Sequence, residues 1–316
     1  MKPTKNLSCR HAFTQTLTEE AVRDNRVYAV TTDARGSVTL NDYANQLPDQ
    51  FIELGIAEQN AAGVSAGLGL SGKNAFLCGP ACFYSARNVE QIKNDIAYSN
   101  ANVKIIGVSG GVSYGALGST HHSLHDIALY RSIPNISIIL PADFEETVLA
   151  TRYLVQMDGP VYMRLGRSPV PDVYDGNTRQ FIFGKANILK DGSDCTIVAT
   201  GETVAYAVQA AELLTEKGFN TAVLDVHTIK PLDKETILAY AEKTKCMITV
   251  EEHSIYGGLG GAVSELLASH RPTPMRIIGF QDEFLPAGTS QELFSYAGIT
   301  SEHIAKQTID IIEKSK

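Results

Sequence analysis

Short apolar runs alternate with helix-length segments along the whole chain. An uninterrupted apolar run such as residues 103–108 is typical of a strand that is covered on both faces. Longer segments with spaced apolar positions, such as residues 12–23 and 204–217, predict the helices between such strands. The alternation predicts an α/β fold with mainly parallel sheets flanked by helices.

The predicted elements fall into two series. Strands are expected over residues 27–32, 51–54, 75–77, 103–108, 136–140, 161–165, 196–199, 221–226, 247–250 and 276–280. Helices are expected over residues 12–23, 57–70, 86–98, 204–217, 234–243 and 260–268, with a further helix capped by Asp143. Between the series, residues 166–183 contain Pro169, Pro171 and Gly176, which interrupt regular structure. We therefore expect a linker here and two domains, residues 1–175 and 184–316.

Composition narrows the class of protein. The 316 residues suffice for two domains, each with its own core. The net charge of −8 and the lack of a basic tract argue against a nucleic-acid surface, and no apolar run approaches the roughly 20 residues of a membrane span. The N-terminus lacks an apolar signal core, and five scattered cysteines predict reduced thiols in a cytoplasmic protein. Cys78 and Cys82 could bind a metal, but without a second ligand pair buried thiols are favoured.

One acid lies between a predicted strand and a predicted helix. Glu58 follows the apolar run 51–54 and Gly55, and it begins a segment of small residues that packs closely. A helix N-terminus stabilises negative charge, whereas burial beside Ile56 opposes it. The residues alone leave two interpretations open: a catalytic carboxylate or an ordinary helix-terminal acid.

A glycine-rich loop follows the strand at 103–108. Loops at the carboxyl ends of buried parallel strands are where α/β folds bind ligands, and this one carries His121, His122 and His125. Substrate contacts, structural histidines and a zinc site are the three interpretations. The zinc site is disfavoured because no acidic third ligand has a suitable spacing.

Two further segments have alternative interpretations. Phe83 and Tyr84 follow a predicted strand and belong either to the core or to a stacking surface for a heteroaromatic ring. The glycines from 257 to 261 precede a helix and could cradle a phosphate, although a plain glycine-rich turn is favoured.

Taken together, several short sequences resemble the C-terminal part of the transketolases, in register over nearly the whole chain. They are Gly55-Ile-Ala-Glu-Gln59, Gly118-Ser-Thr-His121, Ile133-Pro-Asn-Ile136, Pro141-Ala-Asp143, Leu165-Gly-Arg167 and Thr228-Ile-Lys-Pro-Leu-Asp233. The resemblance implies that the two halves are a pyrimidine-binding domain and a transketolase C-terminal domain.

The resemblance implies thiamine diphosphate as the cofactor and transfer of a two-carbon ketol unit from a ketose to an aldose acceptor. Glu58 matches the glutamate that hydrogen-bonds the aminopyrimidine ring and promotes its imino tautomer. Phe83 and Tyr84 fall in the segment that stacks on this ring. Ile56 and Arg87 are assigned to the same cofactor site.

The resemblance also assigns substrate residues. His121 matches a histidine that contacts substrate oxygens, with His122 beside it, and Ser37 and Arg167 fall where transketolases bind the sugar phosphate. The sequence departs from the family in two places. Leu117 replaces an aspartate that reads a donor hydroxyl, and Ser109 replaces a substrate-contacting histidine. Because buried polar groups discriminate strongly, these departures predict a sugar pair other than xylulose 5-phosphate and ribose 5-phosphate.

The family's diphosphate-binding sequence, Gly-Asp-Gly with a later asparagine that holds Mg²⁺, is not found here, and the segment before Ala12 is too short for another domain. The resemblance therefore implies a split transketolase whose N-terminal subunit holds the diphosphate and Mg²⁺, in a hetero-oligomer expected to be a heterotetramer. One rival is a beta-type subunit of a 2-oxoacid dehydrogenase or a deoxyxylulose-phosphate synthase-like enzyme. The other is a non-catalytic assembly subunit, against which Glu58 argues.

Overall fold

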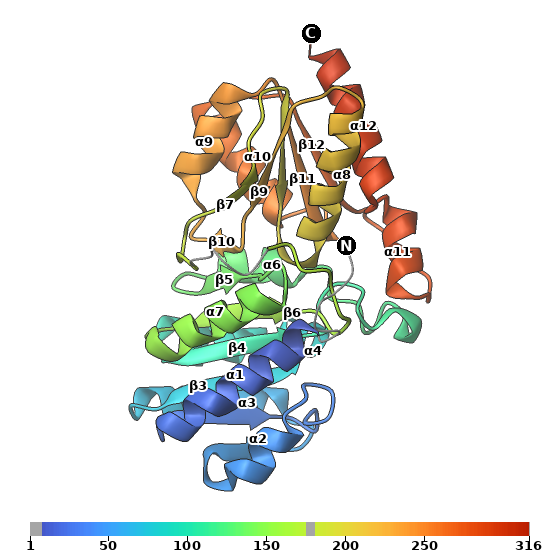
Figure 1. The fold of residues 1–316 in the computed structure, drawn as a ribbon. Helices are drawn as coiled ribbons and strands as arrows, with labels where there is room; N and C mark the ends of the chain where they lie inside the picture. Colours follow the sequence, from blue (N-terminus) through green and yellow to red (C-terminus); the bar gives the residue numbers. More distant parts are fainter. Residues whose placement is uncertain (1–7, 175–180, 316) are drawn as a thin grey trace.

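The computed structural model describes residues 8–174 and 181–315, which form two sheets flanked by helices (Figure 1). The first sheet has the order β10-β5-β6-β4-β3-β1-β2 and the second the order β12-β11-β8-β9-β7. The first sheet consists of β1 (Val27–Thr31), β2 (Phe51–Glu53), β3 (Asn74–Pro80), β4 (Val103–Val108), β5 (Ser137–Ile139), β6 (Val161–Leu165) and β10 (Thr228–Lys230). The second consists of β7 (Asn187–Lys190), β8 (Cys195–Ala199), β9 (Thr221–Asp225), β11 (Met247–Ser254) and β12 (Met275–Phe280).

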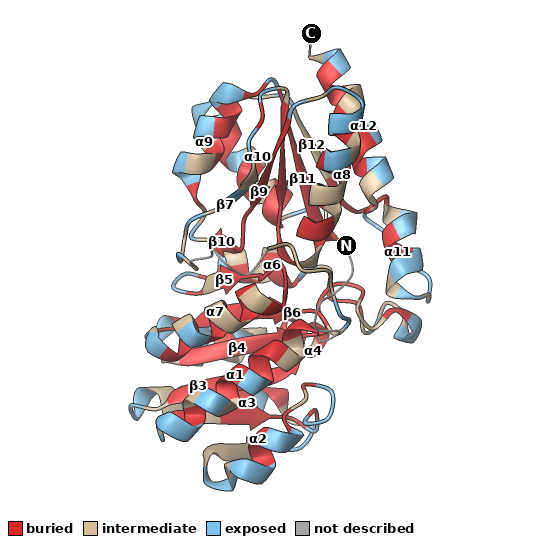
Figure 2. Ribbon diagram, viewed as in Figure 1, coloured by how far each residue is buried: buried red, intermediate tan, exposed pale blue. Residues whose placement is uncertain are grey.

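Helices cover both sheets. Those of the first half are α1 (Cys9–Arg23), α2 (Asn41–Gln46), α3 (Glu58–Leu70), α4 (Ala81–Tyr84), α5 (Val89–Gln91), the π-helix η2 (Ile92–Tyr98), α6 (Asp126–Ser132) and α7 (Phe144–Gln156). Those of the second half are α8 (Val204–Glu216), α9 (Lys234–Lys243), α10 (Leu259–His270), α11 (Ser290–Ala297) and α12 (Ser301–Lys314). The central strands β3, β4 and β8 are buried along their whole length. Figure 2 shows β4 in the colour of buried residues. Strand pairing is parallel except for β10 with β5 and β7 with β9. The prediction of two domains with mainly parallel sheets is confirmed.

Several elements differ from the sequence-based expectation, which did not include α2, α6, β7 or β10. The helix predicted over residues 86–98 begins only at Val89, because Asn88 has non-helical φ and ψ of −123° and 20°, and it then continues from α5 into η2. Strand β10 belongs to the second half of the chain but pairs with β5 of the first sheet. Of the predicted linker 166–183, residues 175–180 lie outside the described residues, and the remainder forms no helix or strand of the sheets.

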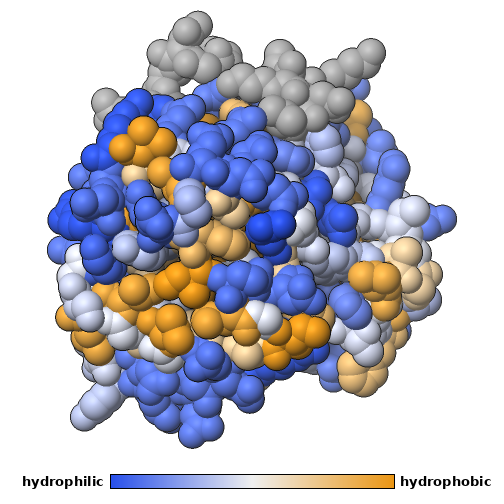
Figure 3. Space-filling model, turned by 90° about the horizontal axis from the view of Figure 1, so that it is seen from below, coloured by the Kyte–Doolittle hydropathy of each residue, from blue (hydrophilic) through white to orange (hydrophobic). Residues whose placement is uncertain are grey.

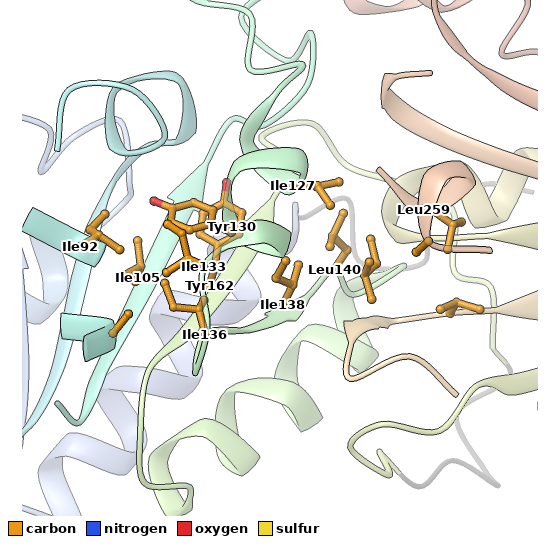
Figure 4. Close-up of a cluster of buried hydrophobic side chains, with 14 of the residues drawn as sticks. Ile92, Ile105, Ile127, Tyr130, Ile133, Ile136, Ile138, Leu140, Tyr162 and Leu259 are labelled. Atoms are coloured by element: carbon orange, nitrogen blue, oxygen red, sulfur yellow. The ribbon is translucent and has the colours of Figure 1, made fainter. Parts of the chain in front are cut away.

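One hydrophobic cluster joins the two domains (Figure 4). In the close-up, Tyr130 and Tyr162 pack against each other near Ile105, with ring centroids 4.2 Å apart. The same cluster reaches Leu259 at the start of α10. Burial of this continuous apolar surface holds the domains against each other.

The end of the molecule that carries α2 and α3 is seen in Figure 3, where hydrophobic areas lie among hydrophilic ones. Exposed large apolar side chains of the first domain include Val22, Ile56, Leu70 and Tyr98. No helix within the described ranges is long and apolar enough to cross a membrane.

Candidate active site

The candidate residues follow the carboxyl ends of parallel strands in the first sheet. Glu58 follows β2, Phe83 follows β3, the loop with His121 follows β4, and Arg167 follows β6. Neighbouring parallel strands end at the same edge of a sheet, so residues far apart in sequence meet there.

Glu58 is the first residue of α3 and is only 5% exposed. Its burial follows from the small side chains of the helix, because Ala61 and Ala62 let the backbone pack closely. The Glu58 carboxylate accepts a hydrogen bond from Arg87 at 2.8 Å, and the Asn88 side chain donates to the Glu58 backbone carbonyl at 3.3 Å. The carboxylate is therefore held in place and is paired with a cation.

Phe83 and Tyr84 have different environments. Phe83 is half-buried, and the Arg87 guanidinium lies over its ring at 3.9 Å from the centroid. Tyr84 is fully buried, and its hydroxyl donates to the Cys78 carbonyl at 3.0 Å. The expectation that Tyr84 forms the stacking surface is therefore corrected, because its ring belongs to the hydrophobic core.

The glycine-rich loop brings His121 to this group. Its ring lies 5.5 Å from Phe83 and 5.6 Å from Tyr114, centroid to centroid, in edge-on arrangements. The Thr120 hydroxyl is 3.0 Å from His121 Nδ1 and orients the imidazole. A continuous series of contacts thus runs from Glu58 through Arg87, Phe83 and His121 to Tyr114.

The series ends at two arginines. The Arg167 guanidinium lies 5.0 Å from the Tyr114 ring centroid, and Arg10 donates to the Ser37 carbonyl at 2.7 Å. Burial lowers the pKa of Arg10, and the positive charge of Arg167 lowers it further. Arg10, which contacts Ser37, and the neighbouring Arg167 form a setting in which an anionic group is stabilised.

Sequence reasoning missed Arg10 and Tyr114. Arg10 lies before the helix predicted at residues 12–23, and the helix begins at Cys9 instead. A basic residue near a helix N-terminus interacts unfavourably with the helix dipole. This unfavourable position was the signal that could have marked Arg10 as a functional residue. Tyr114 had no signal beyond its place in the loop after β4.

Other predicted residues do not join this series of contacts. His122 is buried, and its Nε2 is 3.1 Å from the Gly115 carbonyl, so the ring braces the loop from inside. Ile56 is 75% exposed and Leu117 is 56% exposed. Ser109 is fully buried at the end of β4 with a φ of 58°, a strained backbone conformation for a residue other than glycine.

The glycine-rich turn at the start of α10 binds a carboxylate of the protein itself. The Glu251 carboxylate accepts hydrogen bonds from the backbone N–H groups of Leu259 at 2.6 Å and Gly260 at 2.8 Å. A Cβ on Gly258 would lie 1.9 Å from that carboxylate, which explains the glycine. The helix N-terminus is thus already filled, so the interpretation as a glycine-rich turn is preferred to a phosphate site.

The cysteines are all free and buried, as expected for interior thiols. Within the described ranges, no group of three or more His, Cys, Asp or Glu side chains is arranged to hold a metal ion. Burial raises the pKa of Cys82 to about 11, so this thiol is protonated at neutral pH.

The fold agrees with the comparisons with known proteins. The family model described as "Transketolase, pyrimidine binding domain" matches residues 5–172, and "Transketolase, C-terminal domain" matches residues 184–304. The chain therefore belongs to the transketolase family.

The match to several relatives extends over nearly the full length of both chains. The chain is 55% identical over 308 residues to an apulose-4-phosphate transketolase subunit of Phocaeicola vulgatus, covering 98% of each chain. It is 36% identical over 305 residues to a 6-deoxy-6-sulfo-D-fructose transketolase subunit of a Clostridium species, covering 96% of this chain and 94% of that one. A solved structure described as "Split gene transketolase, inactive beta4 tetramer" superimposes with a TM-score of 0.91 at 35% identity, covering 98% of this chain and 100% of that one. Chains of Pichia stipitis transketolase, at 19% identity and a TM-score of 0.79, share the fold.

Proposed function

We propose that this chain is the pyrimidine-binding subunit of a split transketolase, which transfers a two-carbon ketol unit between sugars with thiamine diphosphate. The observation that carries the proposal is the arrangement of Glu58 and Phe83. A nearly buried carboxylate and a half-buried aromatic ring both contact one planar, nitrogen-bearing cation, the Arg87 guanidinium. A planar aminopyrimidine ring, with N–H groups at its edge and a π-face, fits the same pair of contacts.

The thiazolium ring of bound thiamine diphosphate supplies the nucleophilic carbon and the electron sink for cleaving the ketose. In this proposal the chain's own residues bind and orient. The Glu58 carboxylate accepts a hydrogen bond from a proton-bearing ring nitrogen of the aminopyrimidine, and Phe83 stacks on its face. His121, oriented through Nδ1 by Thr120, presents Nε2 to a substrate oxygen and moves a proton there.

The substrate is proposed to be a sugar with an anionic end. Arg10 and Arg167 lie close enough to depress the pKa of Arg10, and a phosphate or sulfonate between them would relieve this repulsion. The names of the two curated relatives specify a phosphate and a sulfo group, respectively. The exposed Leu117 offers no hydrogen bond to a donor hydroxyl, which supports a sugar pair other than the usual pentose phosphates.

The diphosphate and Mg²⁺ are proposed to bind to a separate N-terminal subunit, with domains of this chain at residues 1–175 and 184–316. A relative of equal length that is itself one transketolase subunit, and a split-gene structural neighbour, support a hetero-oligomer, which we propose is a heterotetramer.

Replacing Glu58 tests the proposal. Glu58→Gln in the reconstituted complex should lower ketol transfer by about 10²–10⁴-fold, in the range of lost proton-transfer catalysis, while assembly with the partner is unchanged. Glu19→Gln, an exposed glutamate on α1, is the matched control and should retain activity. Undiminished turnover in Glu58→Gln would exclude this role. Product analysis with a 2-oxoacid and with a ketose separates the rival reactions.

A further inference from the structure

We infer that Arg87 is a built-in cap of the cofactor's pyrimidine seat, defined as the Glu58 carboxylate together with the Phe83 ring. The inference rests on the proposed function, which assigns these two groups to the aminopyrimidine. Both groups are occupied by one guanidinium, at 2.8 Å from Glu58 Oε1 and 3.9 Å from the Phe83 centroid.

The guanidinium meets the chemical requirements of the seat. It is planar, carries N–H donors at its edge and stacks on aromatic faces. These are the features that a carboxylate and a phenyl ring would select in an aminopyrimidine. Because 3.9 Å is van der Waals contact, a ring and the guanidinium cannot lie on the same face of Phe83 together.

Local structure holds the cap near the seat. The backbone N–H of Arg87 donates to the Phe83 carbonyl at 2.9 Å, so one helical turn separates the two residues. Side chains four positions apart lie on the same helical face, which directs the guanidinium over the ring. The next residue, Asn88, is fully buried and hydrogen-bonded to the Glu58 backbone.

The two partners differ in how easily they can move. The Arg87 side chain is 46% exposed, whereas that of Glu58 is 7% exposed. Separating a partly exposed ion pair costs little, since water solvates the departing cation. By contrast, the Arg164 side chain is 5% exposed and is bonded on both sides. Arg87 can therefore swing into solvent and leave the Glu58 carboxylate in place for the cofactor.

The cap makes binding a competition. A closed seat reduces apparent affinity by the fraction of molecules that are open, so a seat closed nine times in ten weakens binding about tenfold. The structure therefore assigns Arg87 a role in keeping the isolated chain from binding the pyrimidine ring before the partner subunit supplies the diphosphate contacts.

The test uses calorimetric titration. The full chain alone is titrated with 4-amino-5-hydroxymethyl-2-methylpyrimidine, and the complex with the partner subunit is titrated with thiamine diphosphate and Mg²⁺. Arg87→Ala should bind both about tenfold more tightly than the native chain. Arg152→Ala, which removes an exposed arginine from an ion pair between α7 and α1, is the control and should leave both affinities unchanged.

Two further measurements sharpen the result. Arg87→Lys keeps the cation but not the planar stack, so its affinity should fall between the native and alanine values. Millimolar guanidinium chloride should compete with the pyrimidine probe in Arg87→Ala and have a smaller effect on the native chain. Unchanged or weaker binding in Arg87→Ala would overturn the cap. If the native complex binds no thiamine diphosphate, or Glu58→Gln keeps the native turnover, the proposed function fails first, and the cap fails with it.

Discussion

The domain junction contains a buried ion cluster whose removal should be costly. Arg164 in β6 donates to Glu252 in β11, at 2.6 Å to its carbonyl and 3.0 Å to its carboxylate, and lies 3.4 Å from the Asp126 carboxylate. Asp126 is fully buried and Glu252 is 8% exposed. Arg164→Met would leave two buried carboxylates without their cation. Breaking a buried pair in this way costs about 3–5 kcal/mol.

The loss of stability in Arg164→Met should depend on pH. Burial raises the pKa of Glu252, and Arg164 opposes that rise. Without Arg164 the folded state binds protons more tightly than the unfolded state, so stability falls as pH increases. The variant should therefore lose more stability at pH 8 than at pH 5.5.

Urea unfolding followed by circular dichroism measures these effects. Adding Glu252→Gln to Arg164→Met should recover part of the loss, because one uncompensated charge is removed. Arg276→Met is the control: its side chain is 28% exposed and pairs with Asp310 at 2.7 Å, so about 1 kcal/mol or less is expected. A loss below about 1 kcal/mol in Arg164→Met, or one that does not vary with pH, would refute the reasoning.

Three further predictions concern stability. The pKa of Glu202 is raised to about 8 by burial and by Glu252, so the folded state holds this proton more tightly than the unfolded state. Its stabilising effect is complete below pH 4.5 and is lost as pH rises to 8. The free energy of unfolding of Glu202→Gln should therefore rise relative to that of the native chain over this pH range, by an amount on the order of a few kcal/mol. Urea titrations at several pH values measure this difference. Gly111→Ala should destabilise the protein by about 2 kcal/mol or more in the same assay, because φ is +58° and the new Cβ would lie 2.1 Å from Glu252. Gly67→Ala, on the open face of α3, is the control and should cause no loss of stability. Thr289→Ala should cost about 1 kcal/mol in thermal unfolding, because it removes the capping box of α11; an unchanged midpoint would show that the cap contributes nothing.

Local signals were sufficient for most elements. The apolar run at residues 103–108 is β4 as predicted, and small residues after Glu58 form α3 and bury its carboxylate. Both depend on burial of short segments, which a hydrophobic pattern reports directly. The pattern could not predict β10, whose three residues are a strand only because β5 lies beside them.

Some residues of the candidate site could also be predicted from the sequence, and others could not. The sequence indicated Glu58 and His121 through their places after strands and Arg167 through the resemblance to transketolases, but Arg10 enters only because the helix starts at Cys9. Neighbouring aromatic residues were indistinguishable in sequence, and packing alone buried Tyr84 and left Phe83 at the surface of the seat.

By itself, the sequence determined the α/β class, most of the strands and the acid at the start of α3, because each depends on residues close in the chain. Only the tertiary structure decided which side chains meet. The Arg87 guanidinium lies between Glu58 and Phe83, and Arg164 bridges two domains, through contacts among residues up to 88 positions apart. Such pairings depend on how the sheet edges and loops pack in three dimensions, which no local pattern contains.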